Sequence, residues 1–251
     1  MLNPAALAAP GAIVYPESDG LPMSDNTRQF RWIVTLAGNL AALFRDRDDV
    51  FVSGNQFWYP VEGRPDIHAS PDVYAVFGRP KGDRPSYKQW EEGNVPMTVV
   101  FEVRSPRNTD AEMAAKLDFY DEHGVEEYYD FDPDANRLRA YRRGAATLAS
   151  VGNPHNYVSP RLGIRFDLSS PELVVRYPDG EPFLTFEEIA AARRRDKLLA
   201  EQEKQRADQE KRRADLAEQR AARLAELSRK ALQQQATPEE LQELQRLWGT
   251  P

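Results

Sequence analysis

Two acidic side chains and one lysine have the types and spacing needed for phosphodiester hydrolysis. Asp72 follows a proline at the start of a strand-like segment, Glu102 lies near the end of an apolar run, and Lys116 lies in the helical segment that comes next. Such hydrolysis uses a divalent cation that polarises the phosphate and supplies hydroxide at neutral pH. Two carboxylates from adjacent strand ends can bind that cation, and the backbone carbonyl of Val103 could add a third oxygen. A nearby lysine can orient the water or offset transition-state charge.

The composition restricts the metal that such a site could hold. The chain has no cysteine and only three histidines, His68, His123 and His155, which argues against a zinc site. A cation held by Asp72 and Glu102 would therefore be bound through oxygen, as magnesium or manganese are. We expect no small-molecule cofactor.

The elements that must position these residues follow from periodicity and turn signals. Apolar residues at helical spacing predict a helix over 27–45, and the capping-box pair Thr109 and Glu112 predicts a second helix that ends before Gly124. Residues 78–96 read as a long polar loop. Strands are predicted at 50–52, 57–61, 72–77, 97–103, 127–131, 137–141, 161–166 and 173–177. This order predicts an α/β fold, a mixed sheet flanked by helices.

The two ends of the chain differ from this central part. Residues 1–25 predict an irregular lead-in, so the main domain is expected over 26–185. From residue 186 to 235 we predict one long charged helix. It repeats with a period of seven over 200–227 but carries a true apolar seam only near its end, so it is at best a weak coiled coil. A short amphipathic helix is predicted over 236–251. Such a tail could support a homodimer.

Five blocks of sequence, in order, resemble the Uma-type family of restriction-endonuclease-like proteins within the PD-(D/E)xK nuclease superfamily. They are SPDVYAVFG (70–78), GRPKGDRPSYKQWEEG (78–93), VVFEVRSPRNT (99–109), EMxxKxxFY (112–120) and GVEEYYDFDP (124–133). The resemblance extends over roughly residues 15–180. It implies a restriction-endonuclease-like fold and a magnesium-dependent endonuclease that hydrolyses DNA.

The resemblance also implies roles for individual residues. Asp72 and Glu102 fall on the metal ligands, but the lysine position of the E-x-K pattern is occupied by Arg104. The family pattern then places the catalytic lysine on the following helix, at Lys116. Because arginine stays charged and is a poor base, we expect Arg104 to contact phosphate. Tyr120, one helical turn after Lys116, is the second candidate for substrate binding.

One feature of the superfamily has no certain counterpart in this chain. Many members carry another acid on the first helix, where this sequence offers only Asp25 near the start and the neutral Gln29. A site without that acid would bind its metal more weakly than a full site.

Each of these residues also has a plainer interpretation. Asp72 could be a turn residue, Glu102 could form an ion pair with Arg104 or Lys116, and Lys116 could be an exposed helix lysine. Tyr120 could serve core packing. A catalytically weak or inactive protein that binds nucleic acid or a protein partner is therefore the alternative to an active nuclease. A third hypothesis is an interaction protein that assembles through its helical tail.

Charge and hydropathy restrict the class of protein and its expected location. The net charge is −7, yet residues 190–235 hold 13 basic and 8 acidic side chains, against 20 and 32 in the rest. The acidic body argues against a general nucleic-acid coat protein, although clustered carboxylates suit a metal site. No apolar run is long enough to span a bilayer, and the N-terminus lacks the pattern of a signal peptide. We therefore expect a cytoplasmic protein with no membrane contact.

Overall fold

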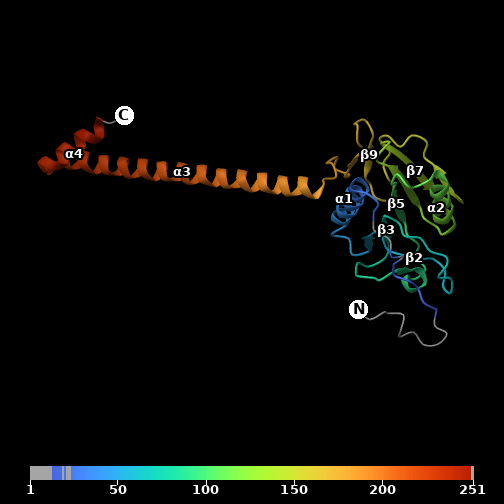
Figure 1. The fold of residues 1–251 in the computed structure, drawn as a ribbon. Helices are drawn as coiled ribbons and strands as arrows, with labels where there is room; N and C mark the ends of the chain where they lie inside the picture. Colours follow the sequence, from blue (N-terminus) through green and yellow to red (C-terminus); the bar gives the residue numbers. More distant parts are fainter. Residues whose placement is uncertain (1–12, 19, 21–23, 250–251) are drawn as a thin grey trace. The chain divides into compact units, whose positions relative to one another are not determined.

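The computed structural model describes residues 13–18, 20 and 24–249 of the chain. Contacts divide the chain into two compact units, Met1–Phe186 and Glu187–Pro251 (Figure 1). The first unit contains all the strands of the described residues, and the second is helical. Much of the predicted irregular lead-in, residues 1–25, lies outside the described residues.

A six-stranded mixed sheet forms the centre of the first unit. Its strand order is β1-β3-β5-β6-β7-β8. The bounds are β1 Val50–Ser53, β3 Val73–Phe77, β5 Val99–Val103, β6 Glu127–Asp132, β7 Arg137–Arg143 and β8 Leu148–Ser150. Strands β5 and β6 pair in parallel, whereas the other neighbours are antiparallel. A parallel pair needs a crossover, which helix α2 (Asp110–Glu122) provides. The predicted α/β fold with a mixed sheet is confirmed.

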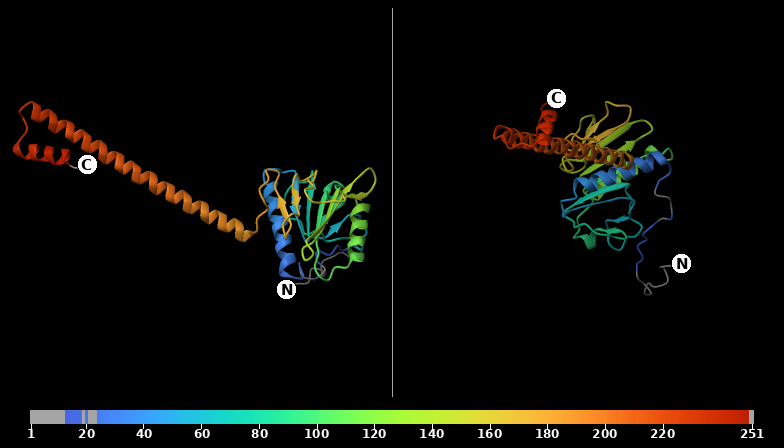
Figure 2. Two further views of the ribbon diagram at one scale, coloured as in Figure 1. Left: turned by 90° about the horizontal axis from the view of Figure 1, so that it is seen from above. Right: turned by 90° about the vertical axis from the view of Figure 1, so that its left-hand side faces the viewer.

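The two faces of the sheet are covered by different helices. Helix α1 (Thr27–Leu43) lies on one face and α2 on the other (Figure 2, left). Alternate residues of each strand therefore enter two separate cores. On the α1 side, Leu36 and Leu40 pack with Phe101. On the α2 side, Tyr120 packs with the neighbouring strand residues Val100 and Tyr128. All five residues of β5 are buried, as expected for a central strand covered on both faces.

Local sequence explains where these helices begin. The side chain of Asn26 caps α1 by accepting a hydrogen bond from the backbone N–H of Gln29. Thr109 and Glu112 form the predicted capping box at the start of α2, and each side chain bonds to the backbone of the other residue. Both helices begin at the end of the sheet where β5 and β6 finish, so their first turns border that end.

Shorter elements differ from the prediction in extent. The segment predicted as a strand at 57–61 is only β2, Trp58–Tyr59, and it pairs outside the main sheet with β4, Tyr87–Lys88. Strand β4 and the 3-10 helix Gln89–Glu92 lie inside the long loop predicted over 78–96. Strands β9 (Arg165–Asp167) and β10 (Val174–Arg176) form a separate hairpin. Phe166 and Val175 of this hairpin pack into the α1-side core.

The second unit consists of α3 (Phe186–Leu232) and α4 (Pro238–Trp248). The predicted long charged helix near the C-terminal end is confirmed by α3. Through the middle of α3 nearly every side chain is exposed. Near its end, Arg223 pairs with Glu243 and Lys230 pairs with Glu240, so α4 is joined to α3 by ion pairs. Leu227 of α3 is fully buried. Self-association through α3 stays a prediction. Among the described residues, no helix has both the length and the apolar character needed to cross a membrane.

Gly54, which follows β1, provides a test of how closely the strands approach near Asp72. A Cβ atom on Gly54 would overlap the backbone carbonyl oxygen of Asp72, whereas one on Gly38 of α1 would meet nothing within 4 Å. We expect Gly54→Ala to lower the free energy of unfolding by about 1–3 kcal/mol, as overpacking does. Gly38→Ala, the matched control, should raise it by about 0.5–1 kcal/mol because alanine favours the helix. Urea denaturation of both variants measures this, and a stable Gly54→Ala protein would contradict the close approach.

Candidate functional site

Three acidic residues form one row across the centre of the sheet. Val73 is opposite Phe101, so the next residues outward, Asp72 and Glu102, face each other across β3 and β5. Glu102 is in turn paired with Asp130 of β6. Because side chains alternate along a strand, all three carboxylates lie on the α2 face, at the end of the sheet where β5 and β6 finish. We call this set the acid row. Its members are all buried.

Asp72 is the member of the row without a cation of its own. Its Oδ2 accepts a hydrogen bond of 2.7 Å from the backbone N–H of Val103. Burial, followed by the nearby charge of Glu102, raises the pKa of Asp72 to about 8, although Lys116 and the Val103 bond oppose this rise. A buried carboxylate in this condition either takes up a proton or requires a cation.

Glu102 is held by two donors from α2. Lys116 Nζ lies 2.6 Å from Oε2, and the Tyr120 hydroxyl donates to Oε1 at 2.5 Å. Lys116 and Tyr120 are four residues apart and therefore share one face of the helix. Burial by itself would lower the pKa of Lys116, but the charge of Glu102 and the hydrogen bond to it raise the value overall. The ion pair considered from the sequence as a plainer role for Glu102 is thus present, within the predicted trio.

Arg104 neutralises the third acid. Its Nε and Nη2 each lie 2.6 Å from a carboxylate oxygen of Asp130, and its Nη1 lies 2.8 Å from Asp110. Arg139 approaches both acids, at 3.1 Å from Asp130 and 3.4 Å from Asp110. The Arg104 side chain is only 8% exposed, whereas that of Asp110 is 78% exposed. Contact of Arg104 with phosphate remains a prediction, and Nη1 is the atom that faces an exposed partner.

The backbone carbonyl of Val103, the expected third metal oxygen, has a partner from α1. Gln29 Nε2 donates to it at 2.8 Å, and Gln29 Oε1 accepts from the backbone N–H of Asp25 at 2.8 Å. The side chain of Asp25 is engaged with Ser105 and Arg107. Of the two first-helix candidates, the neutral Gln29 therefore meets Val103. The sequence singled out neither Asp130 nor the contact between Gln29 and Val103.

The donor set suits a small oxygen-binding cation but is incomplete in carboxylates. Asp72, Glu102 and the Val103 carbonyl would offer three oxygens, and Asp72 lacks a compensating cation. Among the residues described, no three histidine, cysteine, aspartate or glutamate side chains are grouped so that they could hold a metal. The remaining positions would have to be filled by water and substrate, as magnesium sites commonly allow.

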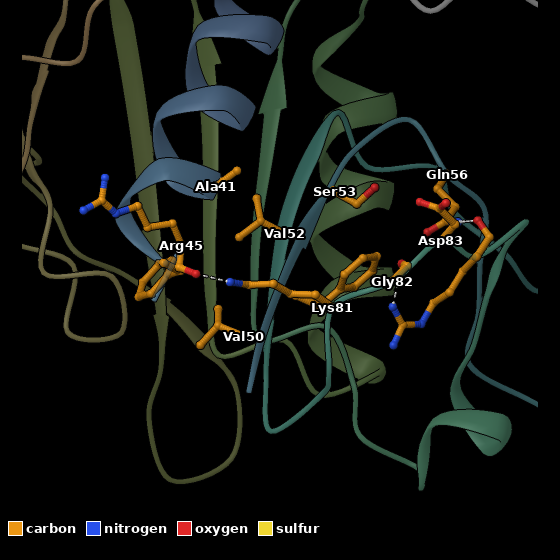
Figure 3. Close-up of a pocket in the computed structure, with 12 residues that line it drawn as sticks. Ala41, Arg45, Val50, Val52, Ser53, Gln56, Lys81, Gly82 and Asp83 are labelled. Carbon is orange, nitrogen blue, oxygen red and sulfur yellow. Dashed lines mark hydrogen bonds between the residues drawn. The ribbon is translucent and has the colours of Figure 1, made fainter. Parts of the chain in front are cut away.

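A larger cavity lies away from the acid row. It has a volume of about 510 Å³ and is bordered by the end of α1, the edge strand β1 and residues 81–84 (Figure 3). Lys81 reaches across it to the backbone carbonyl of Arg45. Asp72, Glu102 and Lys116 do not line this cavity, so the hydrolytic chemistry is not expected there.

Three further side chains near the loop over 78–96 have structural partners. Tyr87 is buried, with its hydroxyl bonded to the carbonyl of Val95, and Trp90 packs against Tyr15. Both side chains therefore attach the loop to the body of the domain. His68 packs on the rings of Phe57 and Tyr59, in keeping with a structural role.

Comparison with known proteins gives a family match and structural neighbours. The family model Uma2, described as "Putative restriction endonuclease", matches residues 19–176. A crystal structure from Anabaena variabilis described as a "putative nuclease" aligns with a TM-score of 0.41 and 13% sequence identity, over 54% of this chain and 73% of that one. No curated protein matches the chain.

The raised pKa of Asp72 predicts how pH affects the metal-free protein. The carboxyl is protonated in the folded state up to a pH of about 8 but ionises near 3.8 when unfolded. Its contribution to stability is therefore present at low pH and is lost as pH rises from about 4 to 8. We expect Asp72→Asn to exceed wild type in unfolding free energy at pH 8.5 in EDTA, by more than about 1.4 kcal/mol, the equivalent of one pKa unit.

Urea denaturation at pH 5 and pH 8.5 measures this difference. The advantage of Asp72→Asn should shrink at pH 5, and Asp130→Asn, which breaks the pair with Arg104, should destabilise the protein at both pH values. Lower stability of Asp72→Asn at pH 8.5 would show that Asp72 is compensated after all.

Proposed function

The chain belongs to the Uma2 family, and we propose that it is a divalent-cation-dependent endonuclease that hydrolyses the phosphodiester bonds of DNA. The observation that carries the proposal is a pair of buried acids that face each other, Asp72 and Glu102. Glu102 is paired with Lys116, whereas Asp72 has no cation of its own. Structural carboxylates are normally paired, whereas a buried acid that still needs a cation marks a functional site.

Asp72, Glu102 and the carbonyl of Val103 would hold magnesium or manganese. When bound, such a cation polarises a phosphoryl oxygen and lowers the pKa of a water molecule. Asp72 would give up its proton as the cation binds, because a ligand must be deprotonated. The resulting site would face phosphate at the end of β5.

Lys116 would act as a fixed positive charge. Its raised pKa keeps it protonated at neutral pH, so it would orient the attacking water and offset transition-state charge without removing a proton. Tyr120 is fully buried, and its hydroxyl would fix the orientation of Glu102. Arg104 would contribute phosphate binding through Nη1. Tyr120 is thus better suited to positioning Glu102 as a metal ligand than to the direct substrate contact expected from the sequence.

A catalytically weak binding module is the second candidate. It is favoured by the two donors that already occupy both oxygens of Glu102, and by the neutral Gln29 at the Val103 carbonyl. Cleavage by the purified full-length protein separates the two functions.

Nicking of supercoiled plasmid in magnesium, manganese and EDTA tests the proposal. We expect cleavage with either metal and none in EDTA. Lys116→Ala and Asp72→Ala should each lower the rate by about 10²–10³-fold, as loss of a transition-state stabilising group does. Asp118→Ala, an exposed acid on the same helix, and Lys211→Ala in α3 are the matched controls. Equal cleavage by all variants would indicate contamination, and none by the wild type would favour the binding module.

Tyr120→Phe tests the positioning role separately. The change removes the only hydroxyl bonded to Glu102 Oε1 among the described residues and leaves the packing volume nearly unchanged. We expect the magnesium concentration for half-maximal cleavage to rise about tenfold, as with loss of a hydrogen bond to a metal ligand. Tyr141→Phe is the control, because Tyr141 stacks on Tyr128 in the same core. An unchanged metal requirement in Tyr120→Phe would leave Tyr120 a packing residue.

A further inference from the structure

Four exposed or partly exposed arginines surround the end of the sheet that carries the acid row, and each is paired with an aspartate. We call them the strand-end arginines. The pairs are Arg28–Asp134, Arg107–Asp25, Arg137–Asp132 and Arg139–Asp110. Arg139 also lies 3.1 Å from the buried Asp130. The arginine side chains are between 33% and 76% exposed. They come from three separate parts of the chain: the first turn of α1, the segment between β5 and α2, and two positions on β7.

Three of the strand-end arginines are linked to the candidate metal ligands through a neighbouring residue or a shared partner. Arg28 precedes Gln29, which bonds the Val103 carbonyl. Arg107 shares Asp25 with Ser105, two residues after Val103. Arg139 shares Asp110 with Arg104. A phosphodiester bond placed against Asp72 and Glu102 would therefore bring the neighbouring backbone phosphates over these arginines.

The charge at this end of the sheet is balanced in the free protein. Each strand-end arginine faces a carboxylate with one negative charge, which is also the charge of a phosphodiester group. Asp134 and Asp110 are 52% and 78% exposed, and exposed ion pairs contribute little to folding stability, so these two carboxylates can be displaced at small cost. Arginine binds phosphate through two parallel hydrogen bonds, and a duplex presents many phosphates at once.

We propose that the strand-end arginines form the contact track for the backbone of duplex DNA, and that their aspartates hold this track closed in the free protein until phosphates replace them. The inference rests on the proposed function and adds to it which surface binds the substrate. It predicts opposite changes in DNA affinity for two classes of substitution. Loss of an arginine weakens DNA binding, whereas loss of its aspartate strengthens it.

An ion pair at the other end of β6 provides a matched control. Arg161 binds Glu126 at 2.5 Å through two nitrogens, with side-chain exposures of 44% and 38%, similar to those of the Arg28–Asp134 pair. Glu126 lies just before β6 begins, so this pair is away from the acid row. A general effect of net charge would change binding equally at both ends.

Binding of a short fluorescein-labelled DNA duplex to the full-length protein, measured by anisotropy without divalent metal, tests the proposal. Asp72→Asn serves as the parent so that no cleavage occurs. On this parent we expect Asp134→Asn and Asp110→Asn each to bind at least about threefold more tightly. Arg28→Ala with Arg137→Ala should bind more weakly. For that pair the slope of log affinity against log salt should become shallower by about 1.8, for two lost phosphate contacts. Glu126→Gln and Arg161→Ala should match the parent.

Three outcomes would overturn specific parts of this account. Equal or weaker binding by both Asp134→Asn and Asp110→Asn, in variants whose thermal unfolding matches the parent, would overturn the displacement of aspartates. An equal gain in Glu126→Gln would overturn the assignment of the track to this end of the sheet. The expected binding pattern together with failed plasmid cleavage would overturn only the nuclease proposal. Absence of DNA binding in the parent and in both aspartate variants would overturn the proposed function and the track together.

Discussion

Three buried carboxylates side by side on one sheet face impose the main constraint on this protein. Charges in such a row cannot remain uncompensated, because burial removes the water that would otherwise stabilise them. Two acids acquire cations, Glu102 from Lys116 and Asp130 from Arg104. The placement of α2 over this face supplies the first of those cations, and the end of β5 supplies the second. Asp72 alone is left to a proton or an external cation.

This division of charges explains why arginine stands at the lysine position of the sequence pattern. Arg104 lies beyond the end of β5 and its side chain extends over β6, where its planar guanidinium matches the Asp130 carboxylate in a bidentate pair. Such a residue serves Asp130 and cannot also serve Glu102. The lysine for Glu102 is therefore provided by the crossover helix, which the parallel pairing of β5 and β6 already requires.

The sequence predicted the parts of the site that depend on local signals. We predicted that Asp72, Glu102 and Lys116 lie close together from three signals: the apolar run before Glu102, the capping box of α2 and the family-like blocks. The role of Asp130 could not be predicted, because it depends on which residue of β6 lies opposite Glu102, and pairing register leaves no mark in a single segment. The contact of Gln29 with Val103 depends on how α1 packs across the sheet end, which helical periodicity alone does not determine. The same limit applies to β2, whose pairing with β4 outside the sheet needed tertiary contacts.

The crossover helix also sets a rule for insertions and deletions. An α-helix turns by about 100° per residue, so one residue added between Asp110 and Lys116 would rotate the ammonium and the Tyr120 hydroxyl away from Glu102 together. A residue added in the loop over 78–96 would instead be absorbed at the surface. The number of residues from Asp110 to Lys116 is therefore fixed by the need to keep Lys116 and Tyr120 directed at Glu102. Alignments of relatives that keep this helix-borne lysine should be gapless there, even where strand-borne motifs have diverged.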